Sequence, residues 1–115
     1  MSLSSLMSRL MGGSSVAAID HDDMVQAVDS GQVYIADVRE PNEYASGHVV
    51  GAKNHPLSQF NPDHLPKDRP VVLVCQAGGR SARALQQALA AGHSQVVHYA
   101  PGTAGWTAHG GRLEF

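Results

Sequence analysis

The architecture of this chain can be inferred from one stretch, Val71-Val72-Leu73-Val74-Cys75-Gln76-Ala77-Gly78-Gly79-Arg80-Ser81. Its first four residues form a short apolar run, which predicts a central parallel strand buried on both faces. Cys75 follows directly, a glycine-containing loop comes next, and a helical pattern then begins at Ala82 and stops at Gly92. A strand, a loop and a helix in this order are typical of open α/β sheets, in which ligands bind at the carboxyl ends of the strands.

The segments on either side repeat the alternation of strand and helix. Upstream, the pattern predicts a strand over 16–19, a helix over 21–29 that Asp20 caps, a strand over 33–36 and a short helix opened by Pro41. A loop follows over 48–56, and a brief helix or turn over 57–64. Downstream, it predicts a strand over 96–99 and a final helix or turn around Trp106. The alternation predicts an α/β fold with a central, mainly parallel sheet flanked by helices on both faces.

The length of 115 residues fits one domain, which we place over residues 15–115. Apolar residues recur at helical spacing over 1–14, so we expect an amphipathic or disordered leader that packs on the domain, pairs with another copy or remains a tail. No apolar run approaches the roughly 20 residues of a membrane span, and the chain begins without the features of a signal peptide. We therefore expect a cytoplasmic protein without a membrane partner.

The composition excludes several classes of function. The formal net charge is −2 and no basic stripe is present, which excludes an electrostatic nucleic-acid interface. Hydrophobic residues make up 43% and charged residues 16%, unlike a disordered chain. The single cysteine permits neither an internal disulfide nor a thiolate zinc site, and the seven histidines lack metal-ligand spacing, so we expect no metal.

The position of Cys75 predicts a reactive thiolate. The start of a helix presents unpaired N–H groups and the positive end of the helix dipole, and the cysteine sulfur is the nearest potential anion. Cysteines in such positions have pKa values of about 3.5–7.5, against about 8.5 in a free thiol. Gly78 and Gly79 are expected to adopt positive φ and to aim the loop amides inward. The predicted binding loop comprises Gln76, Ala77, Gly78, Gly79, Arg80 and Ser81.

Other polar residues have a supporting role in this prediction. Arg80 either adds positive charge beside the sulfur or braces the loop against neighbouring acids, and Ser81 either caps the helix or donates to a bound anion. Asp37 and Arg39 end a neighbouring strand at the same sheet edge. We expect them to form an ion pair that holds the loop, with lining of the site as the alternative.

The spacing of Cys75 and Arg80 separates two kinds of chemistry. Four residues lie between them, and a loop this tight suits a single sulfur atom on the cysteine. Cysteine phosphatases have five intervening residues, which make room for a tetrahedral phosphate. A phosphatase or arsenate reductase therefore remains a weaker alternative. A buried structural cysteine, a non-enzymatic docking or sulfur-carrying module and an oxidant sensor also remain open.

Four motifs in order resemble the rhodanese family over residues 15–112. Cys75 to Ser81 is similar to the family's C-x-x-G-x-R-S loop, and the segment from Asp37 to Tyr44 is similar to D-x-R-x-x-x-E-[FY]. Residues 47–52 resemble G-H-I-x-G-A, and Gly102 and Trp106 stand where the family has G-G-x-x-x-W. The resemblance implies a rhodanese-like domain.

The resemblance also implies sulfur transfer by a ping-pong mechanism, in which Cys75 cycles between thiolate and persulfide. The donor is then thiosulfate, another small sulfur-containing anion or a persulfide, and the acceptor is cyanide, a small thiol or the thiol of a carrier protein. No cofactor is implied. The chain departs from the family at Gln76, where a basic residue is frequent, and at Pro101, where glycine is usual. These departures bear on the choice of donor and partner.

Overall fold

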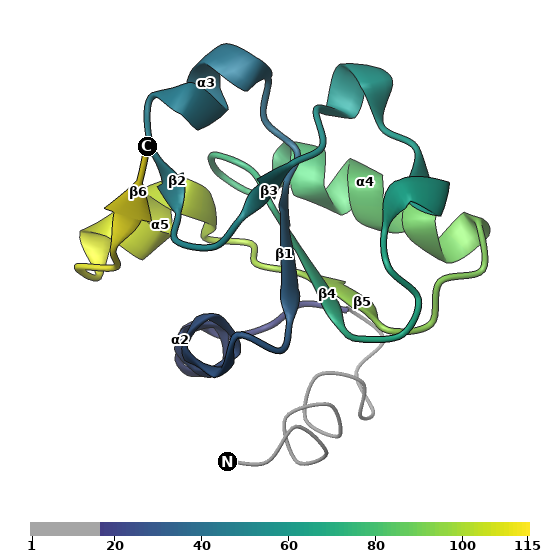
Figure 1. Cartoon of the computed structure of the whole chain (residues 1–115), viewed down its shortest axis with the longest axis horizontal. Coiled ribbons are helices and arrows are strands. Elements are labelled where there is room, and N and C mark those ends of the chain that lie inside the picture. Colours follow the sequence, from purple (N-terminus) through teal and green to yellow (C-terminus); the bar gives the residue numbers. More distant parts are fainter. Residues whose placement is uncertain (1–16) are drawn as a thin grey trace.

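A four-stranded parallel sheet forms the centre of the computed structural model, which describes residues 17–115 (Figure 1). The strand order is β3-β1-β4-β5, and every neighbouring pair is parallel. A second, antiparallel pair joins β2 and β6. The strands are β1 (Tyr34–Asp37), β2 (His48–Val49), β3 (Lys53–Asn54), β4 (Val71–Val74), β5 (Val96–His98) and β6 (Leu113–Glu114). The predicted α/β class with a mainly parallel sheet is confirmed.

Helices cover both faces of this sheet, and Figure 1 shows α4 on the opposite side of β1 and β4 from α2 and α5. The side chains of β4 alternate between two apolar clusters: Val72 and Val74 belong to one, Leu73 and Cys75 to the other, which includes Leu85 of α4. All of β4 is buried, as the apolar run predicts. The helices are α2 (His21–Ser30), α3 (Pro41–Ala45), α4 (Gly79–Ala90) and α5 (Gly102–Ala108), with 3-10 turns η1 (Leu57–Gln59) and η2 (Pro62–His64).

Three elements differ from the sequence-based expectations. The predicted strand over 16–19 is reduced to a single bridge between Ala18 and His98, in which Ile19 N–H donates to the His98 carbonyl at 3.0 Å. Residues 48–56, expected to be a loop, contain β2 and β3. Helix α4 begins at Gly79 rather than at Ala82, so its first turn includes the end of the predicted loop. The leader predicted over 1–14 lies outside the described residues.

The parallel register brings the carboxyl ends of β1, β4 and β5 to one edge of the sheet. Asp37 is opposite Val74, and Leu73 is opposite His98. The chain after β4 therefore leaves the sheet beside the chain after β1, which places Cys75 and Arg39 at the same edge. No helix within residues 17–115 has the length and apolar character needed to cross a bilayer.

The first turn of α5 packs directly against the chain after β4. Thr103 N–H donates to the Cys75 carbonyl at 2.8 Å, and Ala104 N–H donates to the Gln76 carbonyl at 3.1 Å. Gly102 permits this close approach, since its φ is +69° and a Cβ there would collide with the Gln76 and Cys75 carbonyls. Helix α5 thus fixes the backbone that follows the central strand.

The approach of α5 predicts that Gly102→Ala destabilises the protein more than an alanine at a glycine of similar φ. The control is Gly31→Ala, because Gly31 has a φ of +67° and open space around it. We expect Gly31→Ala to cost about 1 kcal/mol of unfolding free energy from backbone strain, and Gly102→Ala about 2 kcal/mol more from the collision. Urea unfolding measures both, and equal losses would contradict the proposed packing.

Candidate functional site

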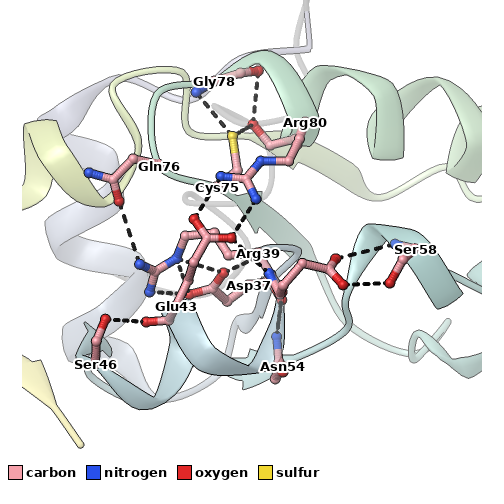
Figure 2. Close-up of polar contacts among 12 residues, drawn as sticks. Asp37, Arg39, Glu43, Ser46, Asn54, Ser58, Cys75, Gln76, Gly78 and Arg80 are labelled. Carbon is pink, nitrogen blue, oxygen red and sulfur yellow. Dashed lines mark hydrogen bonds and ion pairs between the residues drawn. The ribbon is translucent and has the colours of Figure 1, made fainter.

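The sulfur of Cys75 lies at the start of α4, among hydrogen-bond donors (Figure 2). Gly78 N–H donates to Cys75 Sγ at 3.0 Å, and Ser81 Oγ lies 3.5 Å from the same sulfur. Cys75 is only 1% exposed, yet it forms part of the floor of a hollow of about 380 Å³. The other lining residues are Gln76, Ala77, Gly79, Arg80 and Arg83. The hollow is therefore the side from which the sulfur is nearest to solvent among the cavities that include Cys75 in their lining.

The environment favours the anionic form of Cys75. Burial by itself raises the pKa of the Cys75 thiol. The Ser81 hydroxyl and the backbone N–H groups of Ser81, Ala77 and Gly78 hydrogen-bond to the sulfur and outweigh the effect of burial, so the pKa lies below its ordinary value. The direction agrees with the sequence-based expectation of an activated thiol, and its cause is hydrogen bonding at the start of a helix.

Two carbonyls held by α5 explain why the loop amides face the sulfur. In a trans peptide the carbonyl and the following N–H point in opposite directions. Since the carbonyls of Cys75 and Gln76 accept from α5, the N–H groups of Gln76 and Ala77 point away from α5. Gly78 then reverses the chain with a φ of +100°, and a Cβ there would lie 2.6 Å from the Ala100 carbonyl oxygen.

The two glycines of the loop differ in backbone conformation, and only one of them has the expected positive φ. Gly78 adopts the predicted positive φ and is the N-cap of α4. Gly79 does not: it is the first residue of the helix, and a Cβ added there would meet nothing within 4 Å. The expectation that both glycines need positive φ was wrong for Gly79, because the helix starts earlier than its apolar pattern indicates.

Arg80 braces the site through an ion pair with Glu43 of α3. Its Nη1 and Nη2 donate to the two Glu43 carboxylate oxygens at 2.6 and 3.0 Å, and both side chains are about one-third exposed. This bidentate contact lowers the pKa of Glu43 from 4.5 to about 2. Arg80 thus braces the loop against an acid, and its charge also interacts with that of Cys75, so neither role predicted for it is excluded. Glu43 had been noted only as part of a motif.

Asp37 and Arg39 form the predicted ion pair beneath the loop (Figure 2). Asp37 is fully buried and accepts from Arg39 Nε at 3.1 Å and from Nη2 at 2.9 Å. Arg39 Nη2 also donates to the Gly47 carbonyl at 2.7 Å, and Nη1 lies 3.5 Å from Gln76 Oε1. Asn54 Nδ2 donates to the Asp37 and Arg39 carbonyls. Arg39 thereby ties the chain after β1 to the loop after β4.

One histidine near the site was missed by the sequence analysis. His98 of β5 is buried, and its Nδ1 lies 3.0 Å from Ser81 Oγ. The sequence contains no signal for this contact, since His98 stands in a strand without a motif. His48 Nδ1 lies 2.9 Å from the Tyr44 carbonyl, a contact that joins β2 to α3. No cluster of three potential metal ligands occurs among residues 17–115.

Comparison with known proteins extends these findings. Residues 20–109 match the family described as Rhodanese-like domain. The chain is 33% identical over 98 residues to a protein of Allochromatium vinosum named Sulfurtransferase, covering 83% of this chain and 92% of that protein. It is 41% identical over 76 residues to an uncharacterized protein of Synechocystis, covering 64% of this chain but only 42% of that longer relative.

A solved structure with a similar fold is the human single-domain sulfurtransferase TSTD1. The TM-score is 0.71 and the identity 25%, and the alignment covers 84% of this chain and 97% of that one. The likeness therefore extends over most of this chain and nearly all of the other.

The ion pair of Glu43 and Arg80 predicts a pH-dependent contribution to stability. The folded-state pKa of Glu43, about 2, lies below its ordinary value of 4.5, so the pair stabilises the protein fully above pH 4.5 and the stabilisation is lost as the pH falls toward 2. Because the pair is partly exposed, we expect Glu43→Gln to cost about 1 kcal/mol at neutral pH. The difference from wild type should shrink across this window in urea titrations.

The control is Asp68→Asn, since Asp68 is exposed and forms no ion pair within residues 17–115. Its difference from wild type should be small and should change little over the same pH range. A Glu43→Gln effect that stays constant down to pH 2 would contradict the assigned pairing.

Proposed function

Since the chain belongs to the rhodanese-like family, we propose that it transfers sulfur through a persulfide on Cys75. The observation that supports this most directly is the set of donors around Cys75 Sγ, which lowers the pKa of the thiol despite its burial. A low thiol pKa supplies the nucleophile that sulfur transfer requires at neutral pH.

In the first half-reaction the Cys75 thiolate attacks the outer sulfur of the donor. A bond forms between Cys75 Sγ and that sulfur, and the donor's sulfur–sulfur bond breaks. The leaving group takes the electron pair, as sulfite from thiosulfate or as a thiolate from an organic persulfide. The products are the leaving group and a negatively charged Cys75 persulfide, so no external oxidant or reductant is required.

In the second half-reaction an acceptor removes the outer sulfur. The nucleophile is cyanide, a small thiolate or the thiolate of a carrier protein, and it attacks the terminal sulfur of the persulfide. The sulfur–sulfur bond breaks and its electron pair returns to Cys75 Sγ. The thiolate is regenerated, which closes a ping-pong cycle.

The first turn of α4 suits a second sulfur atom. The first N–H groups of a helix have no partner within the helix, and Gly79 and Arg80, whose N–H groups are among these, both line the hollow. These donors are fixed before the reaction and favour a negative charge in both states of the cycle, in the manner of an oxyanion hole. The negative terminal sulfur of the persulfide would occupy this cradle.

The arginine of the loop argues against phosphoryl transfer. A phosphatase uses its loop arginine to bind the equatorial oxygens of phosphate, so a carboxylate already paired with that arginine competes with the phosphate for it. Here Nη1 and Nη2 of Arg80 are both engaged by Glu43, and Arg39 is engaged by Asp37. The geometry thus favours a single sulfur over a tetrahedral oxyanion, in line with the four-residue spacing.

Incubation with thiosulfate is expected to add one sulfur atom to the wild-type chain, and addition of cyanide is expected to remove it as thiocyanate. Cys75→Ser should show neither change, because the attacking sulfur is gone. Intact-mass spectrometry measures both steps. Equal sulfur loading of wild type and Cys75→Ser would refute the proposal, and loading by an organic persulfide alone would assign that donor class instead.

Arg83 is expected to favour anionic donors. It is exposed, lines the hollow and forms no ion pair within residues 17–115, whereas Arg39 and Arg80 are both paired. Arg83→Gln should reduce kcat/KM for thiosulfate, a dianion, about three- to tenfold, with a smaller change for a singly charged aliphatic persulfide. The thiosulfate effect should fade at high salt. Arg112→Gln, on a residue outside this hollow, is the control.

A further inference from the structure

A buried chain of three side chains runs from Cys75 into the protein interior, away from the hollow. Ser81 Oγ lies 3.5 Å from Cys75 Sγ and 3.0 Å from His98 Nδ1. Cys75 is 1% exposed, Ser81 0% and His98 8%. The three residues come from the end of β4, the first turn of α4 and the end of β5, so the fold itself brings them together.

We propose that His98 is a positioning residue, whose Nδ1–H donates to the Ser81 hydroxyl and thereby turns the hydroxyl proton toward Cys75 Sγ. Ser81 then acts as a donor to the sulfur rather than as an acceptor. The role of His98 in sulfur transfer depends on the proposed function, whereas its effect on the charge of Cys75 does not.

The proton count of the Ser81 hydroxyl supports this assignment. A hydroxyl has one proton to donate and two lone pairs that accept. Ser81 Oγ has three neighbours: the sulfur, His98 Nδ1 and the Gly78 carbonyl at 3.2 Å. If His98 Nδ1 lacks a proton, it competes with the sulfur for the single hydroxyl proton. If Nδ1 carries the proton, it donates to Oγ, and the hydroxyl proton is free for the sulfur.

The Gly78 carbonyl does not need the Ser81 proton. It also accepts from Ala82 N–H at 3.1 Å, which is the first hydrogen bond of α4. Rotation of the hydroxyl from Gly78 toward the sulfur therefore leaves no buried acceptor without a partner, and buried polar groups without partners are costly. With Nδ1–H on His98 and Cys75 as a thiolate, the Ser81 hydroxyl accepts from His98 and donates to the sulfur, while the Gly78 carbonyl keeps Ala82 N–H as its partner.

The protonation state of His98 agrees with this role. Burial lowers the pKa of His98, so the ring is neutral near neutral pH and carries one proton. Ionisation of Cys75 then releases its proton to water in the hollow, and His98 keeps its own.

The charged or titratable groups nearest the sulfur from the surrounding elements are Arg80 and Arg83 of α4, Glu43 of α3, Asp37 and Arg39 at the end of β1, and His98 of β5.

Among these groups His98 is distinguished by its contact with Ser81. The carboxylates Asp37 and Glu43 are each paired with an arginine. Arg80 interacts with Cys75 through charge alone. Within residues 17–115, His98 is the titratable side chain that contacts a donor of the sulfur. Its effect should therefore be transmitted entirely through the Ser81 hydroxyl.

The test measures the ionisation of Cys75 directly, by thiolate absorbance and by the pH dependence of alkylation, in the full chain. His98→Phe should raise the pH midpoint of Cys75 ionisation by about one pH unit, because it removes the Nδ1 donor. His98→Asn should retain the wild-type midpoint, since its amide N–H lies close to the position of Nδ1. Ser81→Ala should raise the midpoint, and adding His98→Phe to it should cause no further shift.

His93→Phe is the matched control, because His93 is equally buried but lies beyond the other end of α4, with Nε2 2.7 Å from the Pro62 carbonyl. It should leave the Cys75 midpoint unchanged. A wild-type midpoint in folded His98→Phe would overturn the proposal, as would an additional shift in the double variant.

A second measurement needs no substitution. Nitrogen NMR of the wild-type chain reports which ring nitrogen of His98 carries the proton, and a proton on Nε2 alone would overturn the proposal even if His98→Phe does not fold. Failure of the proposed function would look different. The pH midpoint of Cys75 ionisation would still depend on His98, but the chain would never gain sulfur from thiosulfate or a persulfide.

Discussion

The hydrogen bonds from the first turn of α5 to the carbonyls of Cys75 and Gln76 are the constraint on which the site depends. They fix two peptide planes, and the planarity of the peptide bond then directs the opposite N–H groups away from α5. The positive φ of Gly78 completes the turn and brings its own N–H to the sulfur at 3.0 Å. The charge preference of Cys75 is thus built from the Ser81 hydroxyl together with backbone geometry, and neither Arg39 nor Arg80 has to stand unpaired beside the sulfur.

Two of the three arginines near the sulfur, Arg39 and Arg80, are tied to carboxylates rather than offered to a ligand. The Asp37–Arg39 pair is buried and holds the chain after β1 against Gln76, whereas the Glu43–Arg80 pair is partly exposed and joins α3 to α4. Loss of one member of a buried pair leaves an uncompensated buried charge. Breaking the Asp37–Arg39 pair should therefore cost more unfolding free energy than breaking the Glu43–Arg80 pair. Both pairs fix the walls around the sulfur and leave the local net charge small.

The sequence predicted those features that depend on neighbouring residues. The apolar run of β4 indicated a strand buried on both faces, and Asp37 with Arg39 indicated an ion pair; both are observed. The place of Cys75 between this strand and the start of α4 also follows from its neighbours in the sequence. The features that escaped prediction depend on contacts between distant segments. Strands β2 and β6 have two residues each and exist because they pair with one another. Arg80 pairs with Glu43 of α3, and Ser81 contacts His98 of β5, so both partners come from other elements.

The depth of Cys75 has a geometric consequence for any protein that would exchange sulfur with it. With 1% of its surface accessible, at the floor of a hollow of about 380 Å³, the sulfur lies out of reach of a thiol on a flat, folded surface. A macromolecular acceptor would have to present its thiol at the tip of a slender, extended segment that enters the opening. Small molecules face no such requirement, so if the proposed transfer takes place, the hollow would select acceptors by their local thickness rather than by their overall size.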